Sequence, residues 1–164
     1  MSKFRLFCVV FLLLSASGAL SQAVQYDFDK TADFSKFKTY KWITLKSVAP
    51  IDKLTDEQIK AALDTALAQK GFKKADSDNT ADLLIGYQTS ELISEEFSHI
   101  DASHRTITKG DLAVDMFAPA NHNLIWRGVA SKALDPKAKP EKRQKNLNKA
   151  VAKLMKDYPP PANK

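Results

Sequence analysis

Three residues near the middle of the chain have side chains that bind metals: His99, Asp101 and His104. Two imidazoles and a carboxylate are suitable ligands for zinc, nickel or copper. Their spacing places them in an expected surface loop, which does not fix ligand geometry, and no fourth ligand is implied. A solvated hairpin tip explains these residues better, and His122 falls in a similar turn. We therefore expect no metal and no cofactor.

A second group of reactive side chains is acidic: Glu91, Glu95 and Glu96. General acid–base catalysis needs one carboxyl group in an apolar pocket that raises its pKa. These glutamates lie beside serines instead, which is typical of a solvated surface. The sequence also contains no G-x-S-x-G elbow, P-loop, dinucleotide fingerprint or H-E-x-x-H motif. We expect a protein without catalytic residues, and an unfamiliar hydrolase is the weaker alternative.

The basic charge of the chain is concentrated near its C-terminus. The net charge is +6 overall, and residues 132–164 hold ten Lys or Arg against three Asp or Glu. At 100° per residue, five lysines of the predicted last helix fall within an arc of about 80°, opposite its apolar stripe. We call them the lysine row: Lys142, Lys145, Lys149, Lys153 and Lys156.

The lysine row has two interpretations. It is either the solvated side of a helix packed on the core, or a ridge that faces lipid headgroups, lipopolysaccharide, other polyanions or an acidic partner. Nucleic acid is disfavoured, because the chain carries an export signal and no stacking aromatics accompany the lysines.

Three aromatic residues, Tyr40, Trp42 and Trp126, are candidates for a ligand groove or an interface. Packing in the core or on a sheet face is their commoner role. Exposure on a free sheet face would instead indicate a protein or apolar-ligand interface. A carrier that holds a small apolar molecule between sheet and helices therefore stays open as an alternative function.

The N-terminal residues 1–23 have the pattern of a secretory signal peptide. Lys3 and Arg5 precede an apolar run over residues 6–14, and small residues follow up to Ala23. The run is far shorter than the ~20 residues that span a bilayer. We expect cleavage after Ala23, with Ala19 as the weaker site. Cys8 lies inside the run after a phenylalanine, which does not fit lipid attachment.

The elements that carry these residues indicate one α+β domain over residues 24–158, followed by a Pro-rich C-terminal tail at 159–164. We expect strands at 24–28, 39–45, 83–88, 89–99, 108–117 and 124–134, with a helix as the alternative at 89–99 and with 108–117 and 124–134 forming a hairpin. Helices are expected at about 55–70, with a capping box from Thr55 to Gln58, and at about 140–157. The order predicts a mostly antiparallel sheet with two amphipathic helices packed on one face.

Several short motifs occur in a characteristic order: YDFD at 26–29, ADFSKFKTYKW at 32–42, QKGF at 69–72, ADLLI at 81–85, GDL at 110–112, LIWRG at 124–128 and YPP at 158–160. In order and spacing the chain resembles the bacterial family catalogued as domain of unknown function 4136. The resemblance implies an exported α+β envelope domain and brings no catalytic residues. Many relatives carry a lipid-anchored cysteine that this chain lacks.

Together these observations predict a periplasmic or secreted cell-envelope protein that acts by binding or assembly. The expected partner is an envelope protein or an anionic envelope component. No transmembrane segment is expected after signal cleavage, and the sequence does not indicate the oligomeric state.

Overall fold

The computed structural model describes residues 23–45, 51–76, 81–98 and 103–160, and these form a six-stranded sheet with two helices. The signal-peptide prediction and residues His99 and Asp101 lie outside the described residues, apart from Ala23. In chain order the elements are β1 (Ala23–Phe28), the 3-10 turn η1 (Phe34–Lys36), β2 (Thr39–Trp42), α1 (Lys53–Gln69), β3 (Lys73–Lys74), β4 (Leu83–Ser98), β5 (Ser103–Phe117), β6 (Leu124–Leu134) and α2 (Pro140–Leu154).

The sheet has the strand order β1-β6-β5-β4-β2-β3 and is mostly antiparallel, as predicted. The predicted hairpin is confirmed, because β5 pairs with β6 from Thr108↔Leu134 to Phe117↔Leu124. Strand β2 differs, since it runs parallel to both β4 and β3. Helix α1 lies between β2 and β4 in the chain, and a helical crossover joins parallel strands.

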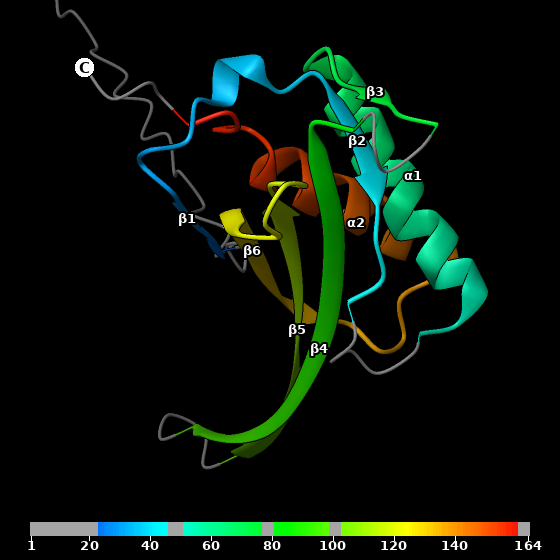
Figure 1. Cartoon of the computed structure of the whole chain (residues 1–164). Helices are drawn as coiled ribbons and strands as arrows, with labels where there is room; N and C mark the ends of the chain where they lie inside the picture. Colours follow the sequence, from blue (N-terminus) through cyan, green and yellow to red (C-terminus); the bar gives the residue numbers. More distant parts are fainter. Residues whose placement is uncertain (1–22, 46–50, 77–80, 99–102, 161–164) are drawn as a thin grey trace, which may run out of the picture.

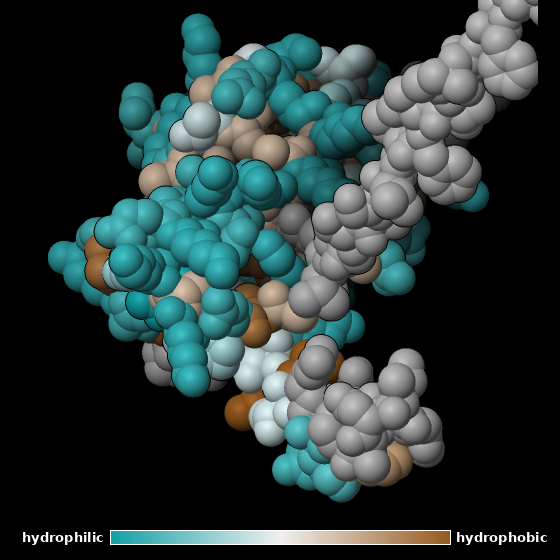
Figure 2. Space-filling model, turned by 180° about the vertical axis from the view of Figure 1, so that it is seen from behind, coloured by the Kyte–Doolittle hydropathy of each residue, from teal (hydrophilic) through white to brown (hydrophobic). Residues whose placement is uncertain are grey.

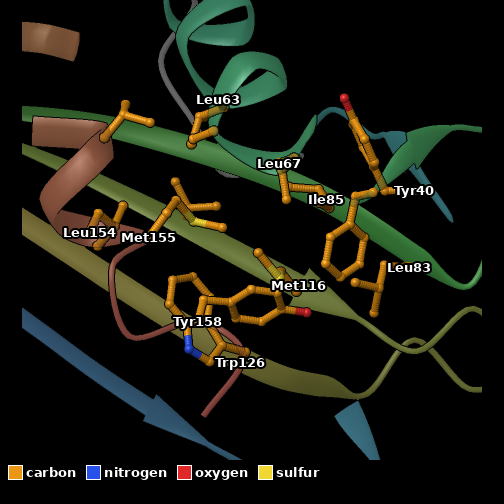
Figure 3. Close-up of a cluster of buried hydrophobic side chains, with 14 of the residues drawn as sticks. Tyr40, Leu63, Leu67, Leu83, Ile85, Met116, Trp126, Leu154, Met155 and Tyr158 are labelled. Atoms are coloured by element: carbon orange, nitrogen blue, oxygen red, sulfur yellow. The ribbon is translucent and has the colours of Figure 1, made fainter. Parts of the chain in front are cut away.

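One face of the sheet packs against both helices, which confirms the predicted α+β architecture (Figures 1 and 3). Leu63 and Leu67 of α1 are 1% exposed, as is Leu154 of α2. They meet the sheet residues Ile85 and Met116, both 0% exposed. Burial of each such side chain contributes roughly 1.5–3 kcal/mol, so this cluster holds the helical layer in place.

Both helices begin or end a few residues away from the predicted positions. Helix α1 starts at Lys53 because the Asp52 carboxylate accepts a hydrogen bond from the Thr55 backbone N–H at 3.0 Å, so the predicted capping box is wrong. Helix α2 ends at Leu154 rather than near 157. Beyond it the chain turns so that the Tyr158 ring packs on Trp126, with 5.2 Å between ring centroids.

Strands β4 and β5 continue well past their neighbours in the sheet (Figure 1). They pair without interruption from Leu84↔Phe117 to Ser98↔Ser103, whereas β6 leaves β5 at Thr108 and β2 pairs with β4 no further than Ile85. The strand expected at 89–99 therefore joins β4, and β5 starts earlier than the predicted residue 108. We call residues 90–98 and 103–111 the β arm.

The sheet face opposite the helices carries a buried ion pair. Asp115 on β5 is 1% exposed, and its carboxylate accepts hydrogen bonds from Nε and Nη2 of Arg127, each at 2.6 Å. Arg127 is its direct neighbour on β6, and Gly86 is its neighbour on β4. The Leu45 side chain lies over Gly86, where a Cβ would meet it at 2.7 Å. This arrangement withdraws the carboxylate from water on an otherwise more open face.

Candidate interaction surfaces

Helix α2 presents four members of the lysine row to solvent, and Lys156, just beyond the end of the helix, is exposed as well. Its other side is buried, since Val151 and Leu154 are 1% exposed. Lys142 forms an ion pair with Asp135 at 3.0 Å. Lys145 and Lys149 contact no acidic side chain within the described part of the chain. The four lysines within α2 are thus exposed while the apolar side of the helix is buried, and the interpretation of the row as a ridge for anions stays a prediction.

Polar contacts fix the position of α2 on the molecule. The Lys132 ammonium on β6 donates a hydrogen bond to the Asn146 side-chain oxygen at 2.8 Å. Lys70, at the end of α1, donates to the backbone carbonyl of Lys156 at 3.2 Å. Helix α2 is thus tied to β6 through Asn146, and the residues that follow it are tied to the end of α1 through Lys156, which gives the row a defined place on the surface.

A hollow lies beside the lysine row, between the outer sides of α1 and α2. It has two adjoining parts of about 720 and 360 Å³, both lined by Gln144, Asn148 and Ala152 of α2. Lys145 and Lys149 line the larger part, together with one acidic residue, Glu141. Small residues of α1 line the other: Ala61, Ala62, Thr65 and Ala66. The α1–α2 hollow therefore combines small apolar side chains with a basic rim, and it does not lie between helices and sheet.

The β arm exposes apolar side chains, which the sequence analysis missed. Leu92, Ile93 and Phe97 of β4 are 63%, 67% and 47% exposed. The Phe97 ring lies 5.1 Å from the His104 ring across the hairpin. Figure 2 shows hydrophobic surface on the arm, at the bottom of the view, next to a mainly hydrophilic body. The signal in the sequence is the pair Leu92-Ile93, which places apolar side chains on both faces of one strand.

The glutamates weighed as catalytic candidates belong to this arm. Glu91 and Glu95 are both exposed and share one face of β4 with Ile93, because side chains alternate along a strand. The side chain of Glu96 lies outside the part of the chain that the structure describes. Neither Glu91 nor Glu95 pairs with a basic side chain in the described ranges. The face of the arm that carries Glu91, Ile93 and Glu95 is therefore acidic and apolar, in contrast to the basic surface of α2, whereas Lys109 lies on the opposite face.

The three candidate aromatics occupy the helix-facing side of the sheet rather than an open groove. Trp126 is 1% exposed and Tyr40 is 3% exposed (Figure 3). The Tyr40 hydroxyl and the Trp42 indole N–H both donate to the Asp64 carboxylate of α1, at 2.6 and 2.8 Å. Burial, followed by the hydrogen bond to Asp64, raises the pKa of Tyr40 above its ordinary value. These contacts anchor α1 on β2.

Of the metal-binding candidates, only His104 and His122 are described. His104 is an exposed residue of β5, and His122 is exposed in the turn before β6, where its φ of 55° is left-handed. Within residues 23–45, 51–76, 81–98 and 103–160, no three His, Cys, Asp or Glu side chains lie close enough to hold a metal ion. In the same ranges no helix is both long and apolar enough to cross a bilayer.

Comparison with known proteins identifies relatives of the sequence and of the fold. The sequence profile of the family described as "Domain of unknown function (DUF4136)" matches residues 24–160. A DUF4136 family protein from Bacteroides thetaiotaomicron has a TM-score of 0.58 and 17% identity, over 84% of this chain and 96% of that chain. No curated protein matches the sequence.

Two further solved structures share the fold. A PDZ domain protein from Parabacteroides distasonis has a TM-score of 0.57 and 12% identity, over 87% of this chain but 37% of that chain. This chain therefore corresponds to about a third of that protein. A PelC dodecamer from Paraburkholderia phytofirmans has a TM-score of 0.52 and 10% identity, over 82% of this chain and 96% of that chain. At such identities the likeness extends to the fold alone.

Proposed function

We propose, on the premise that the chain belongs to the DUF4136 family, that it is an exported cell-envelope protein acting as a binding or assembly domain. In this proposal the lysine row contacts an acidic surface on a partner protein, and no catalytic step is involved. The observation that carries the proposal is the exposure of Lys145 and Lys149 beside a hollow, without acidic partners in the described part of the chain.

The electrostatics of α2 favour contact with an acidic partner. Like-charged ammonium groups along one side of a helix repel each other, and an acidic surface relieves that repulsion. The attraction reaches roughly 8 Å at physiological ionic strength. Lysines suit such diffuse attraction better than bidentate recognition of a single phosphate.

The packing of α2 favours a protein over a lipid surface as the partner. A helix that lies in a membrane interface must bury its apolar side among acyl chains. The apolar side of α2 is already occupied, because Leu154 and Met155 are 1% exposed against the sheet. The remaining surface offers lysines and the amide side chains of Gln144 and Asn148, which can hydrogen-bond to a protein partner.

Assembly is supported by one relative of the fold and export by the sequence. The similar PelC structure is a dodecamer, so a fold of this kind is compatible with a multi-subunit assembly. Export rests on the pattern of residues 1–23. Fractionation of cells that express the chain tests it: we expect the protein in the periplasm or medium, and retention in the cytosol would refute export.

Binding by the lysine row is tested with a charge-reversed variant, Lys145→Glu/Lys149→Glu. The matched control is Lys137→Glu/Arg143→Glu, which changes the net charge equally at exposed positions outside the row. We expect the row variant, but not the control, to lose retention on immobilised poly-L-glutamate. Equal retention of both variants would refute the proposal. Loss of binding only to phosphatidylglycerol vesicles would assign the row to lipid instead.

A further inference from the structure

The β arm has the properties of a docking element. Of the described residues, only the segment from Tyr40 to Ile43 pairs with the outer edge of β4, and it reaches no further than Ile85. Residues 87–95 therefore leave that edge without a strand partner among the described residues. An unpaired edge is a template for contact with another chain, and the exposed Leu92, Ile93 and Phe97 add apolar area.

The charge of the arm restricts what it can contact. Glu91 and Glu95 flank Ile93 on one face of β4. Direct pairing of two identical edges would bring these carboxylates together, and like charges opposite each other destabilise a sheet. Anionic lipid headgroups would be repelled in the same way. The arm therefore fits a surface that is basic at its rim and apolar between the charges.

The same chain carries such a surface. Lys145 and Lys149 line the rim of the α1–α2 hollow, and Ala152 lies within it. Glu91 and Glu95 are four residues apart on a strand, a distance of roughly 13 Å. The helical rise from Lys145 to Lys149 covers roughly 6 Å, and their long, flexible side chains can reach further apart than that. The two carboxylates on either side of Ile93 thus match the lysines of the rim in charge, and Ile93 matches the alanine-lined part of the hollow in polarity.

We propose that the β arm of one copy docks on the α1–α2 hollow of a second copy, with Glu91 and Glu95 against the lysine row and Ile93 in the hollow. This inference rests on the proposed function, because it names the acidic partner of the row. The arm projects away from the helices of its own chain (Figure 1). The contact is therefore head-to-tail, and repetition of it builds a ring or a filament.

Sedimentation velocity of the full chain over a concentration series tests the contact. The row variant Lys145→Glu/Lys149→Glu and the arm variant Glu91→Lys/Glu95→Lys should each associate at least about tenfold more weakly than the wild type, because like charges then face each other. All four positions are exposed, and circular dichroism verifies that both variants fold. The Lys137→Glu/Arg143→Glu control should associate like the wild type.

An equimolar mixture of the two variants provides the decisive measurement. In the mixture, the unchanged arm glutamates of the row variant can face the unchanged row lysines of the arm variant. The lysines introduced in the arm variant can likewise face the glutamates introduced in the row variant. We expect the mixture to recover oligomers that neither variant forms alone. The inference is overturned if the wild type stays monomeric, if the arm variant still assembles, or if the mixture does not recover.

The two proposals fail separately. If the row variant loses poly-L-glutamate binding but the arm variant associates like the wild type, self-docking is refuted. The lysine row then remains a contact for another acidic protein. Unchanged poly-L-glutamate binding in the row variant removes both proposals.

Discussion

Replacing Arg127 with methionine should destabilise the protein strongly, although Arg127 lies on the sheet face away from the main core. The substitution keeps most of the aliphatic stem and removes both hydrogen bonds to Asp115. The carboxylate is 1% exposed, so water cannot replace the lost guanidinium without a local rearrangement. Breaking a buried pair in this way typically costs about 3–5 kcal/mol.

The lower end of that range applies here. The Arg127 side chain is 45% exposed, so solvent already screens part of its interaction with Asp115. We therefore expect the free energy of unfolding to fall by about 3 kcal/mol in Arg127→Met. Urea denaturation followed by tryptophan fluorescence measures this free energy. An unchanged m-value, the slope of the free energy of unfolding against urea concentration, shows that the folded state is otherwise intact.

A double variant separates the loss of the pair from the loss of packing. Asp115→Leu/Arg127→Met replaces both charges with apolar groups, and such replacements of buried pairs are often neutral or stabilising. We expect it to recover most of the stability lost in Arg127→Met. A single-variant loss below about 1 kcal/mol, or a double variant as unstable as the single one, would show that Asp115 does not depend on Arg127.

Three further predictions concern other parts of the molecule. Gly128→Ala should lower the free energy of unfolding by about 1–3 kcal/mol, because its Cβ would lie 2.3 Å from the Trp126 ring and 2.7 Å from Leu154; a thermal melt no lower than that of the wild type would contradict this packing. Burial alone would raise the pKa of Asp64, but hydrogen bonds from Tyr40, Lys74 and Trp42 outweigh it and lower the pKa. The resulting stabilisation is present above the unfolded pKa of about 3.9 and is lost as the pH falls through the lower folded pKa, so Asp64→Asn should flatten the acid limb of a stability–pH curve; an unchanged limb would argue against it. Ile93→Asp should change the free energy of unfolding by no more than about 0.5 kcal/mol, as expected at an exposed site. A large decrease in a thermal melt would mean that the arm belongs to the folding core.

The regular elements were predictable because their local patterns are strong. The helical period of Ile59, Leu63 and Leu67 predicts α1, and all three residues are buried. Gly71 follows that helix at a φ of 84°, a left-handed backbone conformation that favours glycine at a helix C-terminus. The turn between β5 and β6 is short, so their antiparallel pairing follows directly from the sequence.

Other features depend on contacts between distant residues and could not be predicted from local patterns. The parallel alignment of β2 requires knowing that both β3 and β4, which follow it in the chain, become its neighbours in the sheet. Asp115 alternates with Val114 and Met116 as a surface residue would, and only its pairing with Arg127 withdraws it from water. A strand at 89–99 was predicted, but its continuity with β4 was not, because only the pairing with β5 along its whole length shows that the two form one strand.

The continuity of β4 and β5 limits how the arm can change in length. The arm is made of the same two strands that pass through the centre of the sheet, with unbroken pairing between them. Adding or removing one residue per strand would turn every side chain beyond that point to the opposite face. Insertions or deletions that preserve the surface of the arm must therefore occur in steps of two residues per strand, each changing its reach by roughly 7 Å.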